Sequence, residues 1–130
     1  MFRLRKIIGG RTNVPEIQSI PIHTESSHKE NSLEYLVNGK LYTTNIEGRG
    51  TRYICLETCG VQSKERAAAY KITPDMVFEA SFEGIPSAML VGGKYALDSN
   101  GNVTNTVGDD VILLDVREAA EKGTVMVSFI

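Results

Sequence analysis

The sequence predicts an all-β fold, a small β-sandwich or β-barrel of about eight short strands with an extended N-terminal arm. Short runs rich in β-branched and aromatic residues recur along the chain, and turn residues separate them at spacings of about 8–12 residues. No alternation of strands with long helical patterns is present. With 130 residues, 42% of them hydrophobic, the chain is large enough for one core. We therefore expect an arm and connector over residues 1–32 and one domain over residues 33–130.

The N-terminal segment is basic and alternating. Four basic and no acidic residues lie among the first eleven, whereas the rest holds ten basic against sixteen acidic residues. Phe2 and Leu4 alternate with Arg3 and Arg5, a period typical of a strand lying on a surface. An acidic body repels phosphate, so a protein partner is favoured over nucleic acid, with a solvated terminus as the alternative. The predicted interface residues are Phe2, Arg3, Leu4, Arg5, Lys6, Ile7, Ile8 and Arg11.

Residues 12–32 are predicted to be an irregular connector. Pro15 and Pro21 each remove a backbone donor and keep the preceding residue out of helical geometry. The polar run over residues 26–32 has no period, so one short strand at Gln18–His23 is the only regular element expected here.

A hairpin is the clearest local prediction. The runs Glu34–Val37 and Lys40–Thr44 flank Asn38-Gly39, a pair that accepts two positive φ angles and favours a type I′ turn. A strand at Arg52–Glu57 follows. The alanine-rich run Ser63–Ala69 has high helix propensity but no apolar face, so a strand at Ala68–Ile72 is favoured.

The second half of the chain continues as strands separated by turns. The run Val111–Val116 is apolar at both odd and even positions, which predicts burial on both faces. Arg117–Lys122 is expected to form one helical turn or a loop, closed by Gly123. The other expected strands are Met76–Phe82, Met89–Val91, Lys94–Leu97, Val103–Thr106 and Thr124–Ile130.

Candidate chemical groups are few. Cys55 and Cys59 lack Cys-x-x-Cys spacing, and free thiols are expected. The only histidines, His23 and His28, lie in the connector, and nothing local places them near Cys55. The Asp98–Asn102 run superficially follows a calcium loop, but Val103 stands where that loop needs glycine, so a hairpin turn is favoured.

No catalytic set emerges from the pattern. The chain lacks a Gly-x-Ser-x-Gly elbow, and its glycine-rich stretches lack the Lys-Ser/Thr that follows a phosphate loop. We therefore expect a binding or structural protein, not an enzyme, with no cofactor and no metal. The start of the chain lacks the apolar segment of a secretory signal, and no apolar run approaches the length of a membrane span, so synthesis in the cytoplasm is expected.

Three stretches together carry a family resemblance. They are residues 34–41, residues 51–57 with 71–79, and residues 93–98 with 123–129. In these stretches the chain resembles the small head-decoration, or capsid-associated, proteins encoded beside the major capsid gene in tailed phages and prophages of Gram-positive bacteria.

The resemblance implies a non-enzymatic cement protein of the virion. Such a protein binds the outer face of an assembled capsid and bridges neighbouring subunits, with the major capsid protein as its partner and many weak contacts acting together. The charge and alternation of the N-terminal segment, and not the resemblance, are the reason to assign the capsid contact to it. The final strand Thr124–Ile130 would pair between copies if it lies at a sheet edge, and the sequence leaves dimers and trimers open. Neither direct nucleic-acid binding nor membrane binding is expected.

Other functions remain open at this point. A head–tail completion protein or a tail-associated β protein would be another virion component, and ring formation in solution would favour it. A small-ligand-binding β-barrel would need a closed apolar pocket with converging polar groups.

Overall fold

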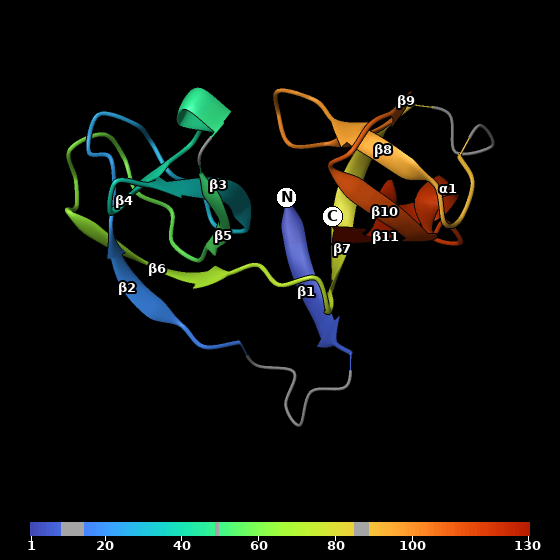
Figure 1. The fold of residues 1–130 in the computed structure, drawn as a ribbon, viewed down its shortest axis with the longest axis horizontal. Helices are drawn as coiled ribbons and strands as arrows, with labels where there is room; N and C mark the ends of the chain where they lie inside the picture. Colours follow the sequence, from blue (N-terminus) through green and yellow to red (C-terminus); the bar gives the residue numbers. More distant parts are fainter. Residues whose placement is uncertain (9–14, 49, 85–88) are drawn as a thin grey trace. The chain divides into compact units, whose positions relative to one another are not determined.

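A computed structural model describes residues 1–8, 15–48, 50–84 and 89–130 (Figure 1). This part of the chain contains eleven strands, a 3-10 turn at Ile46–Gly48 and one short helix, α1 (Ala119–Lys122). The all-β class predicted from the sequence is confirmed, with more strands than the eight expected. The strands belong to two compact units, Met1–Asn13 with Thr73–Ile130 (unit 1) and Val14–Ile72 (unit 2).

Unit 1 is built on one six-stranded sheet in the order β1-β7-β11-β10-β8-β9. Its strands are β1 (Phe2–Ile7), β7 (Met76–Glu83), β8 (Lys94–Leu97), β9 (Val103–Val107), β10 (Val111–Asp115) and β11 (Thr124–Phe129). A parallel pairing of β7 with β9 joins Phe82 to Val103 and closes five of the strands into a ring. β1 lies antiparallel on the first half of β7, with Phe2 opposite Ala80.

Three phenylalanines fill the core of unit 1. Phe2, Phe78 and Phe129 come from β1, β7 and β11, and each is at most 2% exposed. The Phe2 ring lies 5.1 Å from that of Phe129, and Phe78 meets Phe129 edge-on at 5.3 Å. Such tilted and edge-on pairs add to the gain from burial, so β1 is held by the core as well as by its backbone ladder.

Unit 2 is a five-stranded sheet in the order β2-β6-β5-β3-β4. Its strands are β2 (Gln18–Pro21), β3 (Ser32–Val37), β4 (Lys40–Tyr42), β5 (Thr51–Cys55) and β6 (Arg66–Lys71). A parallel bridge between Ile22 and Leu41 brings β4 beside the continuation of β2, so this sheet also curls toward closure. The core residues are Ile20, Ile22, Leu41, Tyr53, Cys55, Cys59, Ala67 and Ala69.

The predicted hairpin is confirmed. β3 and β4 pair with Val37 opposite Lys40, and the two residues between them have the positive φ angles that a type I′ turn requires, 49° at Asn38 and 81° at Gly39. The twist of this turn matches that of the strands, which explains why a two-residue signal was sufficient.

The alanine-rich segment forms strand β6, as favoured over a helix. It pairs with β2 on one side, Ala68 opposite Ser19, and with β5 on the other, Ala69 opposite Cys55. Ala67 and Ala69 are almost fully buried. Two ladders and a buried face therefore outweigh the local helix propensity of alanine, which amounts to less than about 1 kcal/mol per residue.

Several local predictions need correction. Leu114 in β10 is 36% exposed, so Val111–Val116 is not buried on both faces. Leu90 and Val91 belong to a turn instead of a strand, because Gly93 donates to the Leu90 carbonyl at 2.9 Å. The strand expected at Gln18–His23 is present as β2, and the bridge between His28 and Cys59 adds order to the polar run that was expected to be irregular. The strand at Thr124–Ile130 and the helical turn before Gly123 are both present.

The boundaries between the units differ from those expected at residue 32. Unit 2 lies within the sequence of unit 1, because β1 precedes it and its partner β7 follows it. Phe2 pairs with Ala80 across most of the chain, and no local pattern reveals a pairing of such sequence separation. The first strand is therefore part of a folded unit and not an arm beside one.

Candidate protein-interaction surfaces

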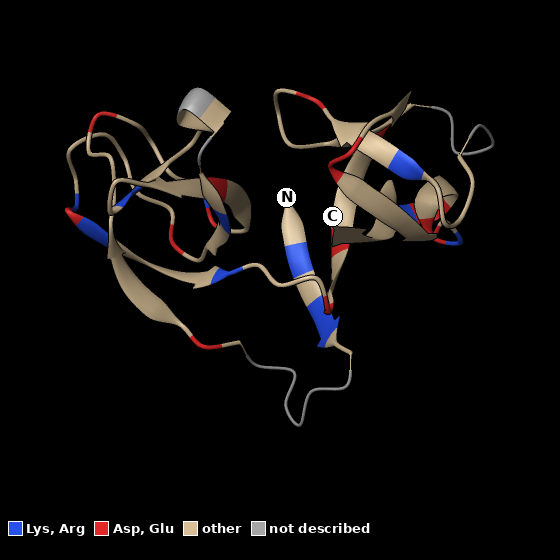
Figure 2. Ribbon diagram, in the orientation of Figure 1, with Lys and Arg blue, Asp and Glu red and all other residues tan. Residues whose placement is uncertain are grey.

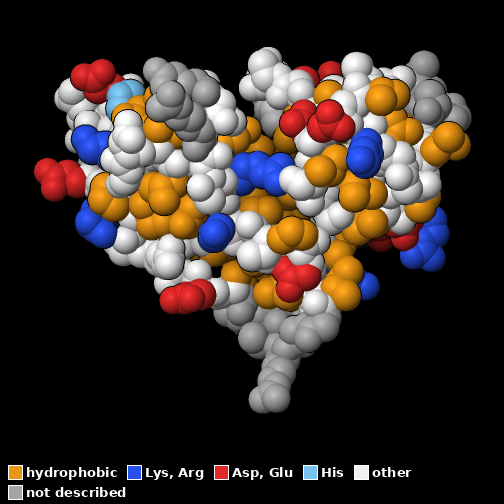
Figure 3. Space-filling view, viewed as in Figure 1, with side chains coloured by type: hydrophobic (Ala, Val, Ile, Leu, Met, Phe, Trp, Pro, Cys, Tyr) orange, Lys and Arg blue, Asp and Glu red, His pale blue; other side chains and the backbone are white. Residues whose placement is uncertain are grey.

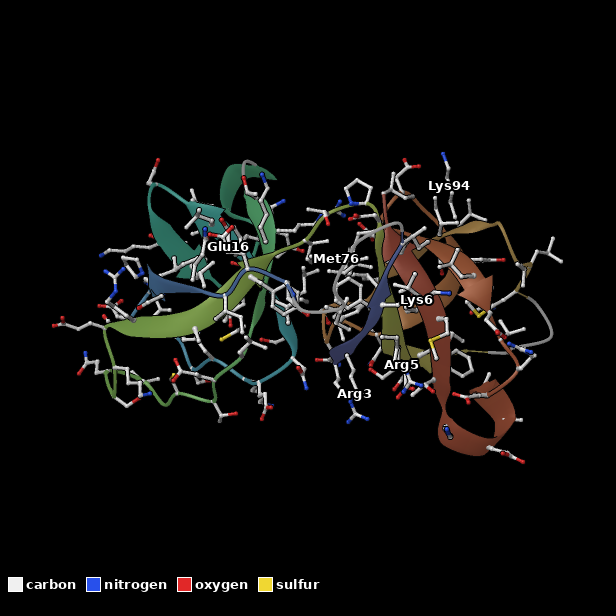
Figure 4. The ribbon with its side chains drawn as sticks, turned by 90° about the horizontal axis from the view of Figure 1, so that it is seen from below. Arg3, Arg5, Lys6, Glu16, Met76 and Lys94 are labelled. Atoms are coloured by element: carbon white, nitrogen blue, oxygen red, sulfur yellow. The ribbon has the colours of Figure 1, made fainter. Side chains whose placement is uncertain are left out.

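The predicted N-terminal interface residues divide between core and surface. Phe2 is fully buried, Leu4 and Ile7 are half-buried, and Ile8 is 59% exposed. The basic side chains Arg3, Arg5 and Lys6 are exposed on β1 (Figure 4), and Figure 2 shows the basic stretches of this strand in blue. The remaining predicted residue, Arg11, lies outside the described residues. The segment thus presents charge while its apolar side chains help to hold unit 1 together.

A bulge shapes this strand. The register shifts between Leu4 and Lys6, so that Arg5 is the extra residue. Bulges and basic side chains are devices by which natural proteins protect edge strands from pairing with other chains. The geometry therefore favours contacts with a partner through the side chains of β1 over main-chain pairing with a partner strand.

A row of polar side chains crosses the outer face of unit 1. Arg3 lies opposite Glu79, Glu79 opposite Met126, and Met126 opposite Asp115, so four strands contribute one residue each. Glu79 is only 6% exposed. Its carboxylate forms salt bridges with both arginines of β1, with Arg5 at 3.4 Å and with Arg3 at 3.9 Å. The row thus runs from a basic residue to an acidic one, then to a methionine and to a second acidic residue.

A pocket of about 480 Å³ opens at one end of this row. Its lining residues are Arg5, Asp115, Arg117, Glu118, Thr124, Val125 and Met126. Arg117 donates from Nε and Nη2 to both oxygens of Asp115, at 2.6 to 3.1 Å. These hydrogen bonds hold the pKa of Asp115 below its usual value, so this pair is fixed as an ion pair at neutral pH.

Apolar side chains are exposed around the start of β8. We call Leu90, Val91, Val107 and Leu114 the β8 rim; they are 74%, 63%, 82% and 36% exposed. Backbone hydrogen bonds join the segments that carry them: Gly92 donates to Leu113, and Gly108 donates to Lys94. Figure 3 shows hydrophobic side chains reaching the surface of this unit, and Lys94 points outward from β8 in Figure 4.

The turn at the β8 rim is firmly anchored. The Tyr95 hydroxyl accepts a hydrogen bond from the backbone N–H of Leu90 at 2.7 Å. The backbone N–H of Gly92 donates a hydrogen bond to the Leu113 carbonyl at the same distance. Leu90 and Val91 are therefore held in solvent by a fixed backbone. Adjacent exposed apolar side chains of this kind are typical of protein contact sites.

The Asp98–Asn102 run is a turn between β8 and β9. Asp98 Oδ1 accepts from the backbone of Asn100 and Asn102, both at 2.9 Å, and these bonds lower the pKa of Asp98. The carboxylate thus closes the turn, as favoured from the sequence. Within the described ranges, no group of three or more His, Cys, Asp and Glu side chains is arranged to hold a metal ion.

The structure brings together a buried polar cluster that sequence reasoning missed. His28 Nδ1 lies 2.6 Å from Glu34 Oε1, and its Nε2 lies 2.9 Å from the His23 carbonyl. The backbones of His28 and Cys59 exchange two hydrogen bonds, at 2.8 and 2.9 Å. The only advance signal was a charged residue at an inward position of the hairpin strand, Glu34.

This cluster has the properties of a structural network. His28 and Glu34 are at most 1% exposed, and Cys55 is fully buried beside Glu34. Burial raises the pKa of the Cys55 thiol to about 12, so the nucleophilic thiolate is strongly disfavoured. The hydrogen bonds of the cluster join β3 to the loops that carry His23, His28 and Cys59.

Comparison with known proteins adds no assignment. No family model, no curated protein and no solved structure matches this chain. Among the described residues, no helix has the length and apolar content needed to cross a membrane.

Proposed function

We propose that this chain is a structural component of a tailed-phage virion that binds the outer surface of the assembled capsid and bridges its subunits. The observation that carries the proposal is the β8 rim, four exposed apolar side chains on an anchored backbone. Unit 1 gains nothing in its own fold from exposing them, whereas a partner surface that covered them would gain from their burial.

The division of the chain supports bridging. Each unit has its own sheet and core, and the chain passes between them twice because unit 2 lies within the sequence of unit 1. Two folded units on one chain can engage two neighbouring subunits of a lattice. Repetition over the lattice then multiplies weak contacts into stable attachment.

The basic side chains of β1 offer a second contact with the partner, in addition to the β8 rim. Arg3, Arg5 and Lys6 are exposed, and basic side chains of this kind steer a chain toward acidic groups on its partner. The proposed partner is the major capsid protein, the proposed place of action is the capsid surface, and further copies of the chain are the proposed neighbours on the lattice.

A sedimentation assay with expanded capsids that lack the protein tests this proposal. Val107→Ser removes the most exposed residue of the rim, and Val61→Ser is a matched control at an isolated valine, 57% exposed, in unit 2. Both variants should keep their stability within about 0.5 kcal/mol. We expect Val107→Ser to weaken capsid binding about tenfold and Val61→Ser to leave it unchanged.

Two results would contradict the proposal. One is the absence of wild-type binding while circular dichroism shows a folded β protein. The other is equal binding by the two variants, which would exclude the rim as the contact. Rings formed with tail components would instead identify a head–tail or tail protein.

A further inference from the structure

Two buried polar atoms of unit 1 have no hydrogen-bond partner among the described residues. They are Glu118 Oε2 and Thr124 Oγ1, and both side chains line the outer-face pocket. Thr124 is only 8% exposed. Because buried polar atoms in folded proteins are almost always paired, two unpaired atoms at one pocket point to a group that binds there.

The strand register directs Thr124 toward the pocket. Val125 and Val127 on β11 are buried in the core at 2% exposure or less, and side chains alternate along a strand. Thr124 therefore shares the outer face with Met126, and the two lie opposite Ser81 and Glu79 on β7. The Thr124 hydroxyl and the half-buried Met126 side chain lie on the same wall of the pocket.

Two acceptors that line the pocket have no hydrogen-bond partner among the described residues. Arg5 is paired with Glu79 at 3.4 Å, and Arg117 is paired with Asp115 and also attracts the charge of Glu118. Glu118 Oε1 meets Lys122 at 3.3 Å in an exposed pair of the kind that contributes little. The unmatched atoms are thus a carboxylate oxygen and a hydroxyl, and both can accept a hydrogen bond.

We propose that this pocket receives a lysine side chain of the partner protein. The ammonium group has three donors and can donate to Glu118 Oε2 and Thr124 Oγ1. The aliphatic stem of a lysine packs along apolar surface, which Met126 provides. The identification of the partner as the capsid rests on the proposed function, but the chemistry of the pocket does not.

The pocket is tested first in the free protein. We would titrate it with n-butylammonium, which reproduces the lysine side chain, and follow backbone amides by NMR. Saturable shifts centred on Glu118, Thr124 and Met126, with n-butanol and inorganic phosphate giving none, are the expected result. Shifts of equal size with n-butanol, tighter binding of phosphate, or no shift with n-butylammonium would each overturn the proposal.

Variants then test the two acceptors. Thr124→Val removes the hydroxyl at nearly constant shape, and Glu118→Gln replaces the carboxylate. We expect each to weaken n-butylammonium binding about tenfold. Thr124→Val should also raise the midpoint of thermal unfolding of the free protein, because it removes an unpaired buried group. Thr43→Val, at an exposed threonine of unit 2, should change neither property.

Capsid sedimentation separates this inference from the proposed function. If wild-type protein binds capsids and Thr124→Val and Glu118→Gln bind as tightly, the lysine pocket is excluded while the proposed function stands. If wild-type protein does not bind, the proposed function fails, and the n-butylammonium titration decides the pocket alone. Weaker capsid binding by both variants, with Thr43→Val unchanged, supports the two together.

Discussion

The two units bury their polar groups in opposite ways. In unit 2, both ring nitrogens of His28 and both carboxylate oxygens of Glu34 have hydrogen-bond partners. The second oxygen of Glu34, Oε2, accepts a hydrogen bond from the Ser32 hydroxyl at 3.2 Å. In unit 1 the core is aromatic, and two buried atoms without a partner in the described part of the chain, Glu118 Oε2 and Thr124 Oγ1, line a pocket on the outer face. A complete network is typical of a structural role, whereas an incomplete one at a pocket indicates a place for another molecule.

The largest effect is expected where the complete network is broken. Glu34→Ala would leave His28, which is 1% exposed, without its carboxylate partner. Removal of one member of a buried pair costs about 3–5 kcal/mol, so unit 2 should unfold at a much lower urea concentration. Chemical denaturation followed by circular dichroism and NMR measures the loss.

A double variant sharpens this prediction. His28→Leu combined with Glu34→Leu removes both members of the pair and should recover most of the loss, because neither side chain is then left buried without its partner. Full recovery is not expected, since the His23 carbonyl loses its donor. If the double variant is less stable than Glu34→Ala alone, the unpaired His28 side chain is not the reason for the loss of stability in Glu34→Ala.

A comparable loss in unit 1 should come from its aromatic core. Phe2→Ala empties a fully buried site beside Phe78 and Phe129 and should cost about 3–5 kcal/mol, toward the lower end if the chain end relaxes into the space. Ile8→Ala, at a side chain that is 59% exposed, is the control and should change stability by less than about 0.5 kcal/mol. If Phe2→Ala and Ile8→Ala both change stability by a similar small amount, the N-terminal segment is an arm and not a part of the core of unit 1.

Alkaline pH should affect unit 2 before unit 1. Burial raises the pKa of the Cys55 thiol to about 12 and also raises the pKa of the Tyr70 hydroxyl. Above the ordinary thiol pKa of about 9, the unfolded chain loses a proton that the folded chain keeps, so stability falls as pH rises. Amide exchange in β5 and β6 should accelerate above pH 9 before that in β7 and β11.

The matched control for this smaller effect is Cys55→Ala. It should make the loss of stability above pH 9 shallower without abolishing it, because Tyr70 still contributes. If the urea midpoints of the variant and of the wild type decline in parallel between pH 8 and 10, the buried thiol is not a source of the pH dependence.

Local patterns predicted the local elements well. The turn at Asn38-Gly39 and the strand Thr124–Phe129 follow from preferences of neighbouring residues. The division into two units could not be predicted from such preferences, because it depends on the pairing of Phe2 with Ala80 and on the bridge between Ile22 and Leu41. Pairings between distant segments leave no trace in the periodicity of either segment.

The candidate surfaces were predicted only in part. The exposed charges of Arg3 and Arg5 were expected. Their salt bridges with the buried Glu79 were not, because Glu79 lies on β7, distant from β1 in the sequence. Thr124 reads as an ordinary polar residue at the start of an apolar strand, and only the structure shows that its hydroxyl is buried without a partner. Satisfaction of hydrogen bonds is a property of the folded neighbourhood, which a single sequence does not display.

Sedimentation of wild-type protein and Val107→Ser with expanded capsids that lack the protein decides whether this chain binds the capsid surface through the β8 rim. We expect saturable binding of the wild type at a fixed ratio to the major capsid protein, and binding about tenfold weaker for the variant. A folded wild-type protein that stays in the supernatant at every capsid concentration would exclude a role on the capsid surface.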